Sequence, residues 1–155
     1  MRKWIVYLMV FVFAFVTDAS GFVGTDVGKL LPVEVVRLSM EMGQVVLETD
    51  TGDRGVGKDL EEALRTLHES AEGTIFLETA DNLILQSGSE YLLEELYRIL
   101  RPSCGLYLEE KKTDPKKITK FLAIHRSDVT LRDWIGGIKK MPVLTESEGR
   151  IILVS

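Results

Sequence analysis

Apolar and polar positions alternate in several short runs of this chain, and the first two runs predict a β-hairpin. Residues 33–40 and 45–50 are rich in valine and alternate imperfectly, which is typical of strands with one buried face. Gly43 lies between them and supplies the residue that a tight turn favours. A glycine-rich stretch, residues 51–58, follows, and we expect it to be a loop.

Helical spacing of apolar residues begins directly after this stretch. Asp59 is suited to cap the amino end of a helix, and Glu62, three residues later, completes a capping-box pattern. Gly73 is the expected stop. The positions that form one apolar stripe along this helix are Leu60, Ala63, Leu64 and Leu67.

The rest of the chain continues with short strand and helix patterns. Strands are expected at 74–77, 83–85, 106–109 and 151–154, and the first two of these could be one strand with an irregular middle. Helices are expected from Ser89 to Pro102, from Asp114 past Leu122, and over 131–138. The order ββαβ(β)αβααβ predicts a single α+β domain at residues 32–155. It would contain a mixed sheet with an N-terminal hairpin and three to four helices packed on it.

The amino-terminal residues predict export. Two basic residues precede an unbroken apolar run, residues 4–16, and a polar break then leads to Ala19, which is the layout of a secretory signal. As a helix the run would span roughly 20 Å, which is short of the roughly 30 Å hydrocarbon core. We expect residues 1–19 to be a cleaved signal peptide and residues 20–31 a tether, so that the protein works outside the cytoplasm. The alternative is an uncleaved run that anchors the chain to the outer face of the membrane.

Charge and cysteine content narrow the class of partner. The chain has 19 Lys and Arg and 24 Asp and Glu, and without residues 1–19 these become 17 and 23. An acidic chain without a basic cluster argues against nucleic acid as a partner and against a polybasic membrane patch.

Cys104 is the single cysteine, so no internal disulfide forms, and we expect a small buried residue rather than a reactive thiol. His68 and His125 lack the spacing of metal ligands, and no metal or cofactor is expected.

One segment matches most of a phosphate-binding pattern. Gly52 to Lys58 reads G-x-x-x-x-G-K between a predicted strand and a predicted helix. Asp59 stands where Ser or Thr would bind Mg²⁺, and its carboxylate would compete with phosphate for the same amide groups. We therefore expect a glycine connection in which Asp59 caps the helix. A small-anion site at residues 52–59, at the amino end of that helix, remains an open alternative.

Two further groups of residues are candidate sites. Glu48 and Asp50 would share a strand face and could serve as the acid and base of a secreted hydrolase, whereas the competing interpretation is a solvated strand face. Arg132 and Trp134 lie next to a glycine pair, a composition typical of a protein contact patch. The competing interpretation places Trp134 in the core.

The order and spacing of the segments between residues 32 and 122 resemble a known family. The segments that carry the resemblance are Val45–Thr51, Gly57–Leu67, Thr74–Leu77, Asn82–Leu85, Tyr91–Leu96 and Leu106–Leu108. Together they resemble the N-terminal domain of Ger(x)C-type proteins, the C subunits of bacterial spore germinant receptors. The chain would be a stand-alone relative, without the cysteine that anchors members of that family to lipid.

The leader and the resemblance together imply an exported, non-catalytic protein at the cell or spore envelope. It would act in spore germination or sporulation through contact with a protein partner. A secreted hydrolase at Glu48 and Asp50, or an extracytoplasmic anion binder at residues 52–59, are the alternatives.

Overall fold

The computed structural model describes residues 30–138, 140–147 and 149–154. The expected signal peptide and most of the expected tether lie outside the described residues. The described residues form a single α+β domain with nine strands and four helices, which confirms the predicted fold class. In this part of the chain, no helix is both long and apolar enough to cross a membrane.

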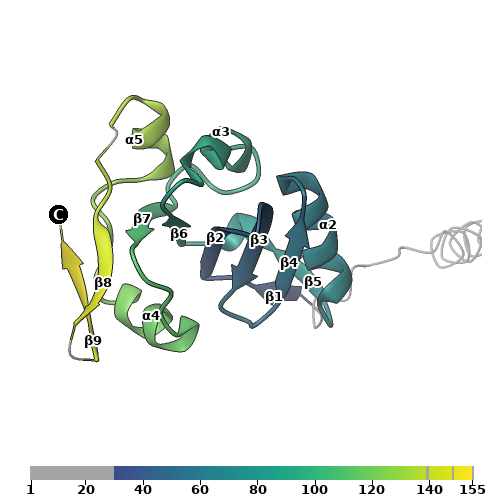
Figure 1. Ribbon diagram of the computed structural model, residues 1–155, viewed down its shortest axis with the longest axis horizontal. Helices are drawn as coiled ribbons and strands as arrows, with labels where there is room; N and C mark the ends of the chain where they lie inside the picture. The colour runs from purple at the N-terminus through teal and green to yellow at the C-terminus, as the bar shows by residue number, and fades with distance from the viewer. Residues whose placement is uncertain (1–29, 139, 148, 155) are drawn as a thin grey trace, which may run out of the picture.

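Seven strands form one mixed sheet that extends across the domain (Figure 1). They are β2 (Val35–Glu41), β3 (Gln44–Thr49), β4 (Arg54–Gly57), β6 (Asn82–Gln86), β7 (Gly105–Glu109), β8 (Val143–Ser147) and β9 (Arg150–Val154). Their spatial order is β4-β3-β2-β6-β7-β8-β9, in which β2, β6, β7 and β8 are parallel and the edges are antiparallel. A separate parallel pair joins β1 (Leu30–Pro32) to β5 (Thr74–Phe76).

The predicted hairpin is confirmed as β2 and β3. Glu41 pairs with Gln44, so two residues form the turn. Met42 has φ 51° and Gly43 has φ 80°, and positive values at both central positions are what a type I′ turn requires.

Residues 51–58 are only partly the loop that the sequence suggested: residues 51–53 form a turn, but Arg54–Gly57 form β4 and pair with β3. A Cβ on Gly55 would lie 2.1 Å from the carbonyl oxygen of Ala63, and a Cβ on Gly57 would lie 2.4 Å from its nitrogen. Both glycines therefore allow α2 (Leu60–Ser70) to pack directly against the strand. Gly55 and Gly57 therefore reflect this close approach, whereas Gly52, with φ 98°, lies in the turn before β4.

The helices lie on both faces of the sheet. α3 (Leu93–Leu96) and α5 (Leu131–Ile135) lie above it in Figure 1, and α4 (Pro115–Leu122) lies below it. The larger core collects buried residues from α2, α3 and α5. The smaller core, under α4, consists of Val35, Ile84, Tyr107, Ile118, Leu122 and Leu144.

Three other boundaries differ from the sequence expectations. The helix expected from Ser89 is a 3₁₀ turn, Glu90–Leu92, followed by the four residues of α3, and its leucine stripe is nevertheless buried. The last helix ends at Ile135 because Gly136 is its C-cap and Gly137 has φ 107°. The expected tether, residues 20–31, is wrong at its carboxyl end, because Leu30 and Leu31 belong to β1.

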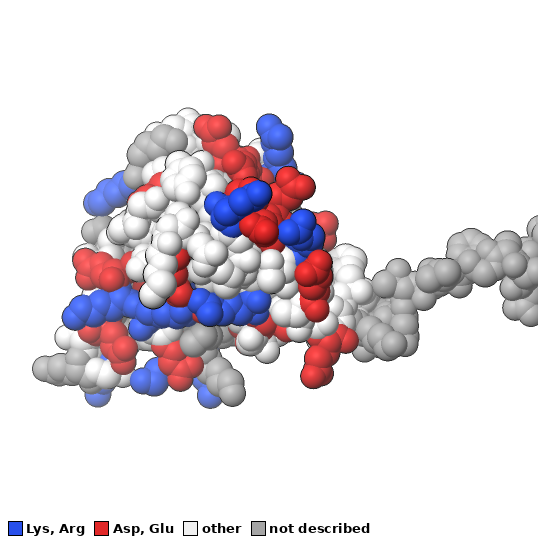
Figure 2. Space-filling view, turned by 45° about the vertical axis from the view of Figure 1, so that its right-hand side comes forward, with Lys and Arg blue, Asp and Glu red and all other residues white. Residues whose placement is uncertain are grey.

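Charges of opposite sign lie close together on the face of the domain that Figure 2 shows. Basic side chains form a narrow band across its lower part, and acidic side chains lie on both sides of that band. Acidic side chains also gather at the upper right of the view, with basic ones among them.

Candidate functional site

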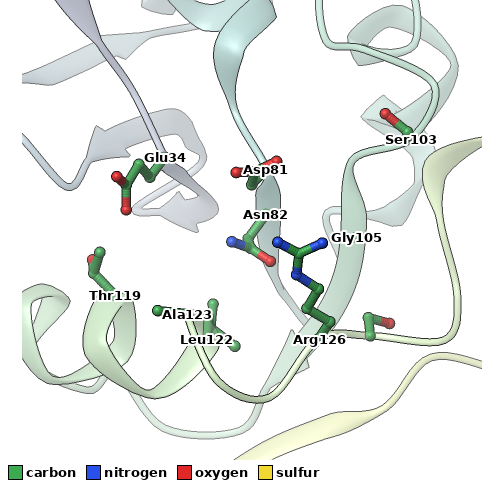
Figure 3. Close-up of a pocket in the computed structure, with 10 residues that line it drawn as sticks. Glu34, Asp81, Asn82, Ser103, Gly105, Thr119, Leu122, Ala123 and Arg126 are labelled. Atoms are coloured by element: carbon green, nitrogen blue, oxygen red, sulfur yellow. The ribbon is translucent and has the colours of Figure 1, made fainter.

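A polar pocket of about 230 Å³ opens at the amino ends of β2, β6 and β7, beside the second half of α4 (Figure 3). Since a water molecule occupies about 30 Å³ of liquid, the pocket has room for a small organic molecule. Its polar lining comes mainly from Glu34, Asp81, Asn82, Arg126 and Ser127.

Asn82 presents a buried amide to this pocket. It is the first residue of β6, pairs with Val35 and Gly105 on the two neighbouring strands, and is only 9% exposed. Its Oδ1 lies 3.6 Å from the place that a Cβ on Gly105 would take, so the glycine leaves the amide uncovered. Among the described residues, none forms a hydrogen bond or ion pair with this side chain. Its donors and its acceptor are therefore available to a molecule in the pocket.

Backbone hydrogen bonds fix Glu34 at the rim. Its N–H donates to Oδ1 of Asp50 at 3.1 Å, and its carbonyl oxygen accepts from the N–H groups of Asp81 and Asn82 at 3.0 Å. The side chain itself is exposed, and no cation lies within ion-pairing distance of it in the described part of the chain. The backbone thus fixes the position from which an exposed carboxylate reaches the pocket, and no cation of the described residues pairs with it.

Arg126 is positioned by the residues on either side of it. The Tyr107 hydroxyl donates to the carbonyl oxygen of His125 at 3.0 Å, and Ser127 Oγ donates to that of Leu106 at 2.9 Å. Burial raises the pKa of Tyr107, which keeps its hydroxyl a donor. The Arg126 side chain extends toward the Asn82 amide (Figure 3), and no carboxylate pairs with it among the residues described.

Asp81 and Ser127, two further polar residues of the pocket, have partners within the protein. The Asp81 carboxylate pairs with Arg101, whose Nε also donates to the carbonyl oxygen of Ala80 at 2.9 Å. Ser127 Oγ also accepts from the N–H of Val129 at 3.0 Å, so it is committed to the backbone and has no base beside it. These contacts do not position Ser127 as a nucleophile.

The expected acid and base, Glu48 and Asp50, do not share a usable site. Asp50 follows β3, and its carboxylate accepts from the N–H groups of Glu34 and Val35. The hollow that both acidic residues line holds about 10 Å³, which is the volume of about one water probe. Burial acts to raise the pKa of Glu48, but hydrogen bonds and charges from Lys112 and Arg37 outweigh it, so this pKa is lowered. A general acid needs the opposite shift.

Residues 52–59 offer no anion cradle. Asp59 Oδ1 accepts from the N–H of Glu62 at 2.8 Å, which confirms the predicted N-cap. The Glu62 carboxylate accepts from the N–H of Lys58 at 3.0 Å, whereas a capping box would place this hydrogen bond on the N–H of Asp59. Two carboxylates therefore occupy the helix end where an anion would bind.

The contact-patch candidates diverge on α5. Residues two apart on a helix do not face each other, and here Arg132 is exposed while Trp134 is partly buried against the larger core.

Cys104 is fully buried, as predicted, and burial raises the pKa of its thiol to about 12. In the part of the chain described, no three His, Cys, Asp or Glu side chains are grouped so that they could hold a metal ion.

Comparison of the chain with protein-family models, curated proteins and solved structures gives no significant match. The resemblance to Ger(x)C-type proteins therefore stays a prediction from the sequence. No pattern in the sequence indicates this pocket, because its residues come from the starts of three strands, from α4 and from the segment after α4. The one available signal was Asn82, a polar residue at the start of an otherwise apolar strand.

Proposed function

We propose that the chain is an exported, non-catalytic binding protein whose pocket takes up a small polar molecule outside the cytoplasm. The observation that carries the proposal is the Asn82 amide, which is buried, has no hydrogen-bond partner among the described residues and lies in a pocket with Glu34 and Arg126. The leader pattern supports export, and the resemblance to Ger(x)C-type proteins supports a role at the cell or spore envelope in germination or sporulation.

The way in which the pocket is built supports ligand binding. Glu34 is fixed through its own backbone, and Arg126 through the anchored residues on either side of it. A backbone that is already fixed leaves less conformational entropy to lose when a ligand binds, which favours affinity for a small molecule. The parallel strands carry this pocket at their amino ends, whereas open α/β sheets usually bind ligands at the carboxyl ends, so the proposal rests on these residues and not on fold analogy.

Thermal unfolding of the purified chain with a panel of small carboxylates, amines, zwitterions, sugars and phosphate tests the proposal. A ligand at about one hundred times its Kd adds about 2.7 kcal/mol of stability, so at least one class should raise Tm by several degrees. Asn82→Leu should abolish the shift, and Gln86→Leu, at the exposed far end of the same strand, should retain it. An absent shift for every class, or an equal shift in Asn82→Leu, would contradict the proposal.

A second observation favours contact with a protein partner, which would act together with the pocket. A groove of about 560 Å³ lies between α2 and α3, with Leu60, Leu64 and Ile99 among its lining residues. Three acidic residues, Glu61, Glu94 and Glu95, and one basic residue, Arg98, also line it. An apolar floor with a net acidic rim suits an amphipathic basic segment of another protein.

Charge reversal tests this second function. The double variant Glu94→Lys and Glu95→Lys should lose a partner that the unmodified chain captures from envelope extracts, because it reverses the field of the groove. Glu78→Lys, an exposed residue outside the groove, should still capture that partner. Equal capture by both variants would rule out the groove as the contact surface.

The mass of the exported protein tests where the chain acts. We expect a mass that lacks residues 1–19, released by signal cleavage. Retention of these residues on an exported chain would instead favour the anchor formed by residues 4–16.

A further inference from the structure

Two charges of opposite sign remain unpaired in the pocket. The Asp81 carboxylate is neutralised by Arg101, which leaves the Glu34 carboxylate and the Arg126 guanidinium. Figure 3 shows these two groups on opposite sides of the Asn82 amide. The pocket therefore has an acidic side, a basic side and an uncharged hydrogen-bonding group between them.

From this arrangement we infer that the ligand is a small zwitterion, with its cationic group at Glu34 and its anionic group at Arg126. The inference rests on the proposed binding function and adds the chemical class of the ligand. A singly charged molecule would pair with one side only and would gain no charge-assisted hydrogen bond from the other. A zwitterion pairs with both sides and remains neutral overall, as the two pocket charges do together.

The rest of the pocket limits the size and shape of such a ligand. A volume of about 230 Å³ admits a molecule of on the order of ten non-hydrogen atoms. Leu122 and Ala123 of the α4 region also line the pocket and supply an apolar wall for a short methylene chain. The Asn82 amide can donate to the anionic group or accept from an ammonium group. A short amino carboxylate meets all of these conditions.

Calorimetric titration of the full chain with ω-amino carboxylates, from glycine to 6-aminohexanoate, tests the inference. Acetate and methylammonium serve as probes that carry one charge only. One chain length should bind best, because the two charged side chains extend from backbone segments that hydrogen bonds hold at fixed positions. That ligand should bind about tenfold or more tightly than either single-charge probe, since a hydrogen bond to a charged group typically contributes about tenfold to a hundredfold in affinity.

Single-charge variants separate the two ends of the ligand. Glu34→Gln should weaken the best zwitterion about tenfold or more and leave acetate binding unchanged, and Arg126→Gln should weaken both the zwitterion and acetate. Both residues are exposed, so these variants should fold. Glu110→Gln and Arg150→Gln, which remove exposed charges outside the pocket, are the matched controls and should bind as the unmodified chain does.

The outcomes distinguish the ligand class from the binding function. If acetate binds as tightly as every zwitterion, or if Glu34→Gln leaves the best zwitterion unaffected, the zwitterion inference is wrong while the pocket remains a binding site. If none of the probes binds and the wider thermal panel also gives no shift, both the inference and the proposed function are wrong. Length-dependent binding that both single-charge variants weaken supports the inference.

Discussion

Arg37 on β2 and Glu109 on β7 form an ion pair that crosses the intervening strand β6. Arg37 Nη2 donates to Glu109 Oε1 at 3.1 Å, and Arg37 Nε lies 3.0 Å from Glu109 Oε2. Both side chains are nearly inaccessible, with 5% and 3% of their surface exposed. Glu109 also accepts from the N–H of Thr113, so the pair fixes the segment that follows β7 as well as the centre of the sheet.

Removing one partner of this pair should destabilise the domain strongly. Glu109→Ala leaves the Arg37 charge buried and only partly compensated, which typically costs about 3–5 kcal/mol. Urea unfolding should show this loss in the free energy of unfolding. The double variant Arg37→Met with Glu109→Leu should recover much of it, because no unpaired charge remains. A loss below about 1 kcal/mol in the single variant would show that the pair contributes little.

Acid should weaken the contacts of Glu48. Burial acts to raise the pKa of this carboxyl, but hydrogen bonds and charges from Lys112 and Arg37 lower it below the ordinary 4.5. A group with a lower pKa in the folded state adds stability above its unfolded pKa and loses it as the pH falls through its folded pKa. The stability difference between the unmodified chain and Glu48→Gln should therefore be constant near neutral pH and shrink below about pH 4.5.

Urea unfolding at a series of pH values measures this difference. Glu110→Gln, which removes an exposed carboxylate from the segment after β7, is the matched control and should follow the unmodified chain. Burial acts to lower the pKa of Lys112, but hydrogen bonds and charges from Glu48 and Glu41 raise it above the ordinary 10.5. The contribution of Lys112 to stability should therefore be complete below about pH 10.5 and be lost only as the pH rises through its raised pKa. A difference between the unmodified chain and Glu48→Gln that grows as the pH falls would contradict the assigned contacts.

Gly55 should be the least replaceable glycine of the β4–α2 contact. In Gly55→Ala the new Cβ would lie 2.1 Å from a backbone oxygen of α2, which cannot move without displacing the helix. We expect a loss of about 3 kcal/mol or more in the free energy of unfolding. Gly43→Ala, with no atom within 4 Å of its new Cβ but φ 80°, should cost only about 1–2 kcal/mol of backbone strain. Equal costs would mean that β4 and α2 do not pack as described.

Cys104 should be inert in the folded protein. Its side chain is fully buried, and burial raises the pKa of the thiol to about 12, so almost no thiolate forms near neutral pH. A thiol-reactive chromophore at about pH 8 should label the native chain negligibly and label one thiol per chain after unfolding in urea. Rapid labelling of the native chain would contradict this burial.

Elements that local sequence determines were predicted well. The hairpin turn at Gly43 and the N-cap at Asp59 each depend on a few neighbouring residues, and both are confirmed. The elements that were missed, such as β8, or misassigned, such as β4, depend on partners that are distant in the sequence. β8 is defined by pairing with β7 and β9, and β4 contains glycines because a helix packs on it. The sequence pattern placed those glycines in a loop, since it does not show that the helix is a neighbour.

The candidate site was not predictable for the same reason. Glu34 and Asn82 become neighbours only because β2 and β6 pair in parallel, and Arg126 joins them through its anchored segment. None of the three belongs to a short motif. The signals that did attract attention, the Gly52–Lys58 pattern and the Glu48–Asp50 pair, have structural roles in β4, in the α2 cap and in the contacts of β3.

The side-chain amide of Asn82 gives the most direct test of ligand binding in the pocket. Its NH₂ resonances in the NMR spectrum of the isotope-labelled chain should move and saturate as the best amino carboxylate is added, because the amide contacts the ligand. The NH₂ resonances of Gln86, at the far end of the same strand, should stay in place. Unchanged Asn82 resonances, with shifts confined to the α2–α3 groove or to α5, would contradict binding in this pocket.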